Sequence, residues 1–414
     1  MPSVHRTVIV GASAAGVSAA LAMRSAGYDG EIVLADADLN VPYERPPLSK
    51  SLLGADSRGL KPIVDDSTYG DQQIELRLGA RVRELDVLAR RVHFEDDAPG
   101  VPADQVLLAT GVAARRLIVP GSELDGVQVL RDAADALALS KHLAAGGPLV
   151  IIGAGFIGLE LAAVARDHGM DVTVVELAAL PLVHVVGSTI GRLVHDRHTA
   201  RGTRFVLGRT VHAFTGSKHL ESVVLDDGGV LPAATAVVGV GVRPRDELAR
   251  AAGLTVDHQG IVVDRSGATD SPWVWAAGDV TSRPHPALAA PGRIEHWDVA
   301  MRHGASVGAA IAGRPNEHTA TLYAWSDQFG STYQLFGRPH PTDTLVLRAD
   351  ATPDRLLAFW LREGRVAAAL GLNHAREIAA SRRLIDRGAS APAEVLADAS
   401  TDLTALAKQL ARSS

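Results

Sequence analysis

The chain contains no cysteine among its 414 residues. Without a thiol it can form neither a redox-active disulfide nor an iron–sulfur cluster held by its own side chains, and cysteine-ligated zinc is excluded as well. Any electrons that the protein transfers must therefore reside on a bound organic cofactor.

The chain also lacks the charge pattern of a nucleic-acid binder and the apolar run of a membrane span. Its formal net charge is −6, and no block of lysine and arginine provides the basic face that phosphate neutralisation requires. The longest uncharged stretch, Leu143 to Leu159, is broken by glycine and proline and is shorter than the ~20 apolar residues that cross a bilayer. Residues Met1 to Arg6 lack the regions of a signal peptide, so a cytoplasmic protein is expected.

Apolar residues and glycine are abundant instead. Hydrophobic residues make up 47% of the sequence, 40 residues are glycine and only 21% are charged, which is typical of a compact α/β enzyme. A chain of 414 residues exceeds the size at which a single hydrophobic core stops growing, so two or three domains are expected.

An internal repeat indicates the fold class. Thr7 to Asp36 resembles Pro148 to Glu176, and each copy reads as a strand, a glycine turn, a helix and a second strand. Such βαβ units have parallel strands and a right-handed crossover. The sequence therefore predicts an α/β fold with two Rossmann-like dinucleotide-binding domains. The short alternating strands from about Tyr323 onward predict a C-terminal α+β domain.

Other segments are predicted from local composition. Three prolines in the segment Val41 to Lys50 argue against a helix there. Strands are expected within Ile74 to Val82, Val106 to Gly111, Ala236 to Pro244, Trp273 to Val280, Asp343 to Arg348 and Leu356 to Leu361.

The second glycine turn has the stronger nucleotide-binding pattern. Gly153, Gly155 and Gly158 form G-x-G-x-x-G between a strand and a helix, where the turn, the approach of a pyrophosphate and the helix–strand contact each require glycine. Glu176 ends the next strand, about 20 residues on, where an acid binds a ribose 2′-hydroxyl. The alternative, a structural turn with a solvated glutamate, is disfavoured by this full context.

The first glycine turn is imperfect. Gly11 and Gly16 are present, but the middle position is Ser13, whose small side chain could itself donate to a phosphate. Asp36 and Asp38 both end the next strand and both remain candidates for the acidic partner, with Asp36 preferred. Two dinucleotide sites without cysteine suggest that hydride passes from a nicotinamide to a flavin, which can then release electrons singly.

The motifs GASAAG, PYERPPLSK, LLATG, VLRDAADA, GAGFIGLE, VTVVE, VGVGVRP, AAGD, RIEHWD, AWSDQ and LGLNHARE follow one another along the chain. Through them it resembles the oxygenase-coupled ferredoxin reductases, the family of putidaredoxin reductase and of the reductase components of aromatic-ring dioxygenases. The resemblance covers nearly the whole chain and implies a glutathione-reductase-like fold. It implies an FAD-binding domain at residues 1–112 and 240–320, an NADH-binding domain at 113–239 and a C-terminal domain at 321–414.

The resemblance also implies site residues. Those for FAD, including Asp36 preferred above, are Gly11, Ser13, Ala14, Ala15, Asp36, Lys50, Val82, Ala109, Thr110, Gly111, Arg131, Gly278, Asp279, Glu295, His296 and Trp297. Those for NADH are Gly153, Gly155, Phe156, Ile157, Glu160, Glu176 and Gly241. Lys50, Glu160 and Trp325 are expected beside the flavin as catalytic residues. Without the resemblance, Lys50 would be interpreted as an exposed lysine and Asp279 as a helix N-cap.

The activity that the resemblance implies is reduction of FAD by NADH, followed by reduction of a small iron–sulfur ferredoxin that serves a cytochrome P450 or a ring-hydroxylating oxygenase. A rubredoxin reductase, an NADH oxidase and a non-catalytic NADH-sensing flavoprotein remain alternatives. An acidic ferredoxin would dock on a local basic patch with Arg338, Arg376, Arg382 and Arg383 as candidates. Ala113 and Ala114 replace the Arg-Pro usual after LLATG, and Ala37 displaces an acid, so weaker FAD binding is expected. No metal site is predicted.

Overall fold

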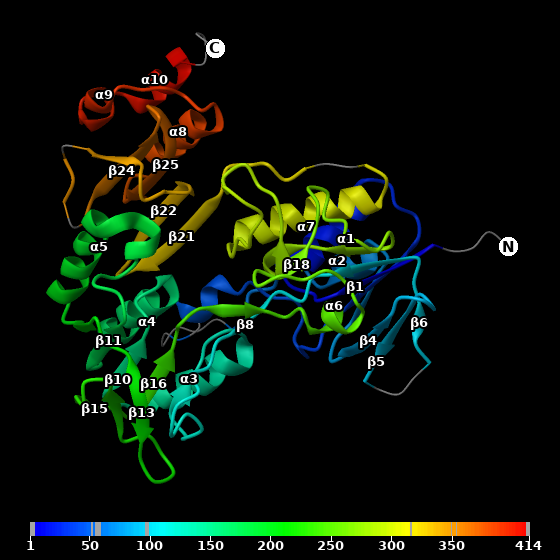
Figure 1. Ribbon diagram of the computed structural model, residues 1–414, viewed down its shortest axis with the longest axis horizontal. Coiled ribbons are helices and arrows are strands. Elements are labelled where there is room, and N and C mark those ends of the chain that lie inside the picture. Colours follow the sequence, from blue (N-terminus) through cyan, green and yellow to red (C-terminus); the bar gives the residue numbers. More distant parts are fainter. Residues whose placement is uncertain are drawn as a thin grey trace. The chain divides into compact units, whose positions relative to one another are not determined.

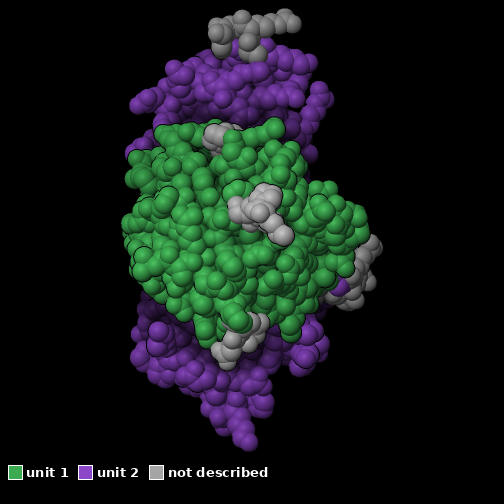
Figure 2. Space-filling model, turned by 90° about the vertical axis from the view of Figure 1, so that its right-hand side faces the viewer, with its two compact units in different colours: residues 1–45, 60–113, 242–320 green, residues 46–59, 114–241, 321–414 purple. Residues whose placement is uncertain are grey.

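The computed structural model describes residues 5–50, 53, 59–95, 99–314, 317–348, 350–352 and 354–410. The chain divides into two compact units, which Figure 2 colours separately. Unit 1 comprises Met1–Arg45, Leu60–Ala113 and Val242–Ala320, and unit 2 comprises Pro46–Gly59, Ala114–Gly241 and Thr321–Ser414.

Unit 1 is built around a parallel sheet of five strands in the order β19-β7-β1-β2-β3. Figure 1 labels its central strand, β1. These strands are β1 (Arg6–Val10), β2 (Glu31–Ala35), β3 (Ile74–Arg77), β7 (Gln105–Leu108) and β19 (Val274–Ala276). Its helices are α1 (Ala14–Ser25), α2 (Ser67–Asp71), α6 (Glu247–Ala251) and α7 (Trp297–Ile311). The other strands of this unit are β4 (Val82–Asp86), β5 (Arg91–Phe94) and β6 (Val101–Pro102), which form an antiparallel sheet, and β17 (Val242–Pro244), β18 (Ile261–Val262) and β20 (Thr281–Ser282). β8 (Val112–Ala114) pairs with β17, and the 3-10 turn η2 spans Gly278–Val280.

Both faces of the unit 1 sheet are buried, as expected for a parallel sheet. Val8 and Val10 of β1 pack into one hydrophobic cluster with the antiparallel sheet and α6, while Ile9 packs into another with α1 and α7. Helix α7 packs so closely against α1 that a Cβ atom at Gly304 or Gly308 would collide with the backbone of α1. Glycine at these two positions therefore allows the short distance between the helices.

Unit 2 contains a second parallel sheet, in the order β12-β11-β10-β16-β9. Its strands are β9 (Val127–Gln128), β10 (Leu149–Ile152), β11 (Val172–Glu176), β12 (Arg204–Leu207) and β16 (Thr235–Val238). The accompanying elements are α3 (Ala133–Ala145), α4 (Phe156–Asp167), α5 (Val183–Ala200) and the antiparallel strands β13 (Val211–Thr215), β14 (Ser222–Leu225) and β15 (Val230–Pro232). The βαβ unit β10-α4-β11 therefore repeats β1-α1-β2 of unit 1, as the internal repeat predicts.

The C-terminal part of unit 2 is an antiparallel sheet in the order β21-β22-β25-β24-β23 with helices packed on one face. Its elements are β21 (Tyr323–Gln328), β22 (Ser331–Gly337), β23 (Thr344–Leu347), β24 (Leu356–Arg362), β25 (Arg365–Leu372), α8 (Ala375–Asp386), α9 (Ala393–Ala397) and α10 (Leu403–Leu410). Leu357 and Phe359 of β24 bury one row of side chains against these helices. The predicted α/β fold with two Rossmann-like sheets and a C-terminal α+β part is confirmed.

One local prediction is wrong. The proline-rich segment that was expected to exclude a helix contains the 3-10 helix η1 (Pro46–Ser49). Pro46 and Pro47 stand in its first turn, where a proline loses no hydrogen bond and its fixed φ suits the helix. In the part of the chain that the structure describes, no helix is long and apolar enough to cross a membrane.

Candidate functional site

The first glycine turn joins β1 to α1. Gly11 has a φ of +109°, and a Cβ atom there would overlap the carbonyl of Ala109 at the end of β7. A Cβ atom at Gly16 would overlap the carbonyl of Gly11 in the same way. Both positions therefore require glycine, because the turn closes tightly onto the neighbouring strand and onto its own helix.

The second glycine turn, between β10 and α4, repeats this geometry. Gly153 has a φ of +105° and faces the carbonyl of Gly239 after β16, and Gly158 faces the carbonyl of Gly153. At the middle position, Gly155, a Cβ atom would have no neighbour within 4 Å. Its counterpart Ser13 has an ordinary extended φ of −108°. Serine in place of the middle glycine therefore causes no steric clash with the protein.

Each turn is tied to the acid that ends the next strand. In unit 1, Asp36 accepts a hydrogen bond of 2.6 Å from the backbone N–H of Ala12 and one of 2.9 Å from Asp38. In unit 2, Glu176 accepts 2.6 Å and 2.8 Å bonds from the backbone N–H groups of Ala154 and Ala178.

Of the two first-turn candidates, Asp36 is thus the structural equivalent of Glu176. The carboxylate of Asp38 accepts hydrogen bonds from Asn40 and Tyr43 instead.

Further predicted FAD residues gather around the first turn. Ala109 donates its N–H to the carbonyl of Val10, and Thr110 donates its hydroxyl to the carbonyl of Arg245 at 2.7 Å. Ala14 and Ala15 begin α1, and a Cβ atom at Gly278 would approach the side chain of Ala15 to 2.8 Å. Gly11, Ala109 and Gly278 therefore surround the start of α1.

The loop that carries Gly278 and Asp279 is supported by a residue that the sequence analysis missed. Gly278 donates its N–H to Nδ1 of His303 at 3.1 Å, and His303 is 1% exposed. Burial lowers the pKa of His303 well below its ordinary value, so its ring stays neutral and Nδ1 can accept. Only the three-dimensional packing of α7 against this loop reveals the contact, since the two residues belong to no shared motif.

The remaining predicted FAD residues are spread over several elements. In unit 1, Val82 lies in the hydrophobic core, and Gly111 has a φ of +66° in the turn after β7. The exposed side chain of Glu295 forms a 2.7 Å ion pair with Arg293. His296 is the N-cap of α7, and Trp297 is the first residue of that helix. In unit 2, Arg131 precedes Asp132, the N-cap of α3, and Lys50 follows η1.

The predicted NADH residues lie at one edge of the second parallel sheet. Gly153, Glu176 and Gly241 lie at or just beyond the carboxyl ends of the neighbouring strands β10, β11 and β16, and Phe156 is the first residue of α4. Large apolar side chains are exposed at the same strand ends: Ile157 is 44% exposed, Leu177 71% and Val240 37%. Such side chains suit a ligand that covers them, since a dinucleotide binds outside the carboxyl ends of parallel strands.

Both turns fit a dinucleotide by their own geometry. The helices α1 and α4 begin without a side-chain cap, so their first backbone N–H groups are left for a pyrophosphate. Among the described residues, no cluster of three or more histidines, aspartates and glutamates could hold a metal ion.

The three residues predicted to be catalytic come together within unit 2. The Lys50 ammonium lies 3.4 Å from Oε1 of Glu160 on α4 and 3.1 Å from Oδ2 of Asp327 on β21. The same ammonium lies 5.5 Å from the ring centre of Trp325, within range of a cation–π contact. The structure therefore assembles a lysine, two carboxylates and an indole from three segments that are distant in the sequence.

Glu160 is 4% exposed and is saturated with hydrogen bonds. Ser326 donates to its Oε1 at 2.7 Å, the backbone N–H of Asp327 donates at 3.3 Å, and Ser49 donates to its Oε2. Burial raises the pKa of Glu160 above its ordinary value, while Lys50 and the two serine hydroxyls oppose that rise. Ser49, Ser326 and Asp327 were missed by the sequence analysis, although each lies within two residues of a predicted residue.

Comparison with known proteins agrees with this geometry. Residues 5–304 match the family model described as pyridine nucleotide-disulphide oxidoreductase, and residues 323–407 match the one described as reductase C-terminal. The ferredoxin reductase component of chlorobenzene dioxygenase from Cupriavidus sp. (strain PS12) is 36% identical, with 97% of each chain covered. The ferredoxin–NAD(+) reductase component of the biphenyl dioxygenase system from Paraburkholderia xenovorans (strain LB400) is 34% identical over 97% of this chain and 98% of that protein.

Solved structures of ferredoxin reductases are also similar to this chain. The ferredoxin reductase for the CYP199A2 system from Rhodopseudomonas palustris is 33% identical, with a TM-score of 0.93 over 97% of this chain and 99% of that chain. The reductase in the covalent putidaredoxin reductase–putidaredoxin complex is 29% identical, with a TM-score of 0.92 over 99% and 98% of the two chains. These likenesses therefore cover nearly the whole chain.

Proposed function

The chain belongs to the pyridine nucleotide-disulphide oxidoreductase family, and within that family we propose that it is an FAD-dependent NADH:ferredoxin oxidoreductase. The observation that carries this proposal is the pair of equivalent glycine turns, each closed on a carboxylate, in a chain without cysteine. Disulfide chemistry is unavailable to this member, so electrons that enter must leave through a bound cofactor.

Two sets of residues would hold the two nucleotides. The turn at Gly11 and Ser13, with Asp36 toward the ribose, would hold FAD in unit 1. The turn at Gly153 and Gly155, with Glu176, would hold NADH in unit 2. FAD, when bound, supplies the conversion of a two-electron hydride transfer into single-electron steps, which no side chain can perform.

The protein's own groups contribute position and charge. Glu160 and Asp327 hold the Lys50 ammonium in place from two sides, and the half-buried Trp325 ring lies beside it. A fixed cation of this kind stabilises negative charge that develops on a neighbouring group, and it needs no reorganisation when the charge appears. We propose that this lysine acts on the flavin.

The electron acceptor is a small iron–sulfur ferredoxin that serves an oxygenase. Support comes from the relatives, which are named as ferredoxin reductase components of dioxygenase systems, and from the solved complex of putidaredoxin reductase with putidaredoxin. Purified protein is expected to be yellow and to release FAD on denaturation. Anaerobic stopped-flow mixing with NADH should bleach the flavin, and added ferredoxin should restore its colour. Reoxidation by rubredoxin or oxygen but not by ferredoxin would contradict the proposed acceptor.

An acidic ferredoxin docks on basic side chains of the C-terminal part of unit 2. Arg338, Arg376 and Arg383 are exposed, whereas Arg382 is half-buried and pairs with Asp386 at 3.5 Å. Charges of this kind mainly accelerate encounter and are screened beyond about 8 Å at physiological salt. Ferredoxin reduction should therefore slow as salt rises, while flavin reduction by NADH should change little. A ferredoxin-dependent rate that is flat with salt would show that docking is mainly apolar.

A further inference from the structure

A chain of buried side chains runs from helix α5 to the Lys50–Glu160 pair within unit 2. Nε2 of His198 lies 2.9 Å from Oε1 of Gln328, Nε2 of Gln328 lies 3.0 Å from Oγ of Ser326, and that Oγ lies 2.7 Å from Oε1 of Glu160. The exposed fractions of His198, Gln328 and Ser326 are 0%, 1% and 0%. Water therefore has little opportunity to substitute for any of these bonds.

The direction of every hydrogen in this chain follows from Glu160. An ionised carboxylate can only accept, so Ser326 must give it its single hydroxyl hydrogen. The Ser326 oxygen then accepts from the amide N–H of Gln328, which orients that amide with its oxygen toward His198. His198 must in turn donate from Nε2. All donors thus point toward Glu160.

His198 is chemically suited to the end of such a chain. Burial lowers its pKa to about 4, and the neighbouring Arg197 and Arg201 act in the same direction, so the ring is neutral and has one N–H to donate. His195 also disfavours its charged form. A neutral ring avoids placing another buried charge beside these arginines.

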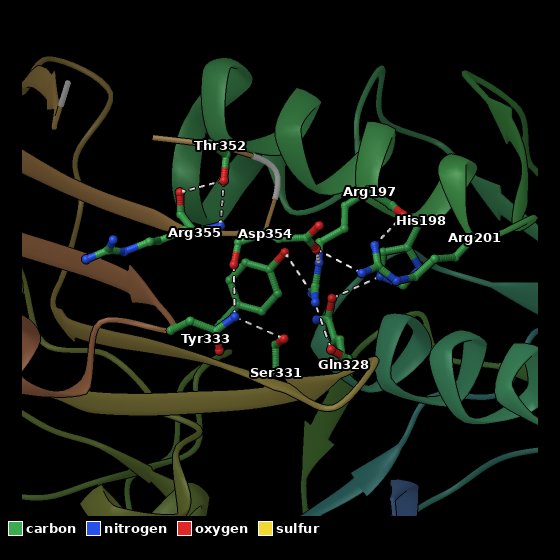
Figure 3. Close-up of polar contacts among 10 residues, drawn as sticks. Arg197, His198, Arg201, Gln328, Ser331, Tyr333, Thr352, Asp354 and Arg355 are labelled. Carbon is green, nitrogen blue, oxygen red and sulfur yellow. Dashed lines mark hydrogen bonds and ion pairs between the residues drawn. The ribbon is translucent and has the colours of Figure 1, made fainter. Parts of the chain in front are cut away.

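Helix α5 also holds the tip of the β21–β22 hairpin, where Gln328 ends the first strand (Figure 3). Buried Arg197 donates to the carbonyl of Gln328 at 3.2 Å and to Asp354 at 3.1 Å, and Arg201 donates to Asp354 at 2.8 Å. Phe329 turns the hairpin with a φ of +52°, and its ring lies 4.8 Å from that of His198. These contacts hold the hairpin tip through the backbone carbonyl of Gln328 and pack Phe329 against His198, and they leave the side-chain amide of Gln328 to the hydrogen-bond chain.

We infer that His198, Gln328 and Ser326 are positioning residues: a one-way hydrogen-bond chain that stabilises the carboxylate of Glu160 and thereby fixes the Lys50 ammonium. The chain acts on Glu160 through Ser326, and neither His198 nor Gln328 contacts Lys50. The importance of this hydrogen-bond chain for electron transfer rests on the proposed function, in which Lys50 acts on the flavin. Its effect on the carboxylate of Glu160 does not depend on that proposal.

The test is a graded series of variants read by the pKa of Glu160. Carbon-labelled glutamate in the FAD-loaded protein reports that pKa by NMR, with Glu160→Gln to assign the signal. Ser326→Ala, Gln328→Met and His198→Leu should each raise the pKa of Glu160, by about one pH unit for Ser326→Ala and by progressively less along the chain. His198→Gln, which keeps an N–H at the same place, should restore the wild-type value.

Asp354→Asn is the matched control, because it weakens the ion pairs of Arg197 and Arg201 and changes no residue of the hydrogen-bond chain. It should leave the pKa of Glu160 unchanged. A shift as large as that of His198→Leu, or no shift in Ser326→Ala and His198→Leu, would overturn the inference. If the pKa shifts as expected but the pH profile of flavin reduction by NADH does not move, the hydrogen-bond chain is supported, and the part of Glu160 in the proposed reaction is what fails.

Discussion

The two glycine turns share their glycine and acid contacts and differ in the residues between and after them. In both turns the first glycine has a φ above +100° and lies close to a carbonyl of a neighbouring segment, and the third glycine lies close to the carbonyl of the first. In both, the acid that ends the next strand accepts a hydrogen bond from the backbone N–H of the residue after the first glycine. They differ at the middle position, Ser13 against Gly155, and in the acid, Asp36 against Glu176. The two residues that begin the helix also differ, since Ala14 and Ala15 stand where the second turn has Phe156 and Ile157. The comparison separates what a βαβ nucleotide site needs in order to fold from what it can vary to choose its ligand.

The largest expected effect comes from the positions that the two turns share. Gly153→Ala places a Cβ atom on the carbonyl of Gly239 and strains a φ of +105°, so it should destabilise the protein by about 2–4 kcal/mol. Gly11→Ala should do the same against Ala109. Gly155→Ala is the control, since its Cβ atom meets nothing within 4 Å. Thermal unfolding of the three variants tests this ranking, and equal melting points would refute it.

The next effect concerns the acids. Glu176→Gln removes the charge that would bind a ribose 2′-hydroxyl and repel a 2′-phosphate. The preference for NADH over NADPH, measured as the ratio of kcat/KM values, should fall by roughly 10- to 100-fold, as expected for a hydrogen bond to a charged group worth about 1.5–3 kcal/mol. Asp36→Asn should weaken FAD binding and leave that ratio unchanged. An unchanged ratio in Glu176→Gln would show that Glu176 does not face the ribose.

A third difference between the units is their response to acid. In unit 1, burial lowers the pKa of His285 to about 4 and that of His318 to about 3, and it lowers the pKa of His303 as well. In unit 2, the described histidine whose pKa is lowered in this way is His198. A histidine kept neutral by folding favours the fold fully above its unfolded pKa of about 6.5, and that contribution is lost as the pH falls toward 4.

Unit 1 should therefore unfold first on acidification, at a cost of roughly 1–2 kcal/mol for each such histidine between pH 7 and pH 5. Calorimetry at both pH values checks this. His318→Gln should reduce the loss of melting temperature between them. Melting temperatures that do not depend on pH in this range would contradict the account of these histidines.

The smallest effect is expected at the middle position of the first turn. Ser13→Gly removes a 3.2 Å hydrogen bond from Arg45 to the serine hydroxyl, and glycine at an N-cap costs only a few tenths of a kcal/mol. FAD affinity and melting temperature should stay close to those of the unaltered protein. A large loss of FAD would show that the serine hydroxyl itself binds the cofactor.

The repeat, the two glycine turns and the fold class could be predicted from the sequence, because strand–glycine–helix spacing is a local property. Asp36 and Asp38 both follow the same strand, so the sequence left both open with Asp36 preferred, and the bond from Ala12 to Asp36 distinguishes them. The contact of His303 with Gly278 could not be predicted, because His303 lies outside every motif. The hydrogen-bond chain from His198 to Glu160 could not be predicted either, because two of its bonds join residues more than 100 positions apart in the sequence. The short helix at Pro46 was missed because proline was weighed as a helix breaker without regard to its place in the first turn.

The central claim is that two turns with matching glycine and acid contacts hold two different nucleotides, and matched aspartates at their N-cap positions test it most directly. Aspartate is a favourable N-cap, and both positions are extended, so Ser13→Asp and Gly155→Asp should fold while repelling a pyrophosphate. Bound FAD and NADH affinity are then measured for both variants. We predict that Ser13→Asp loses FAD and still binds NADH, and that Gly155→Asp keeps FAD and loses NADH. Loss of the same nucleotide in both variants, or the reverse assignment, would contradict the account.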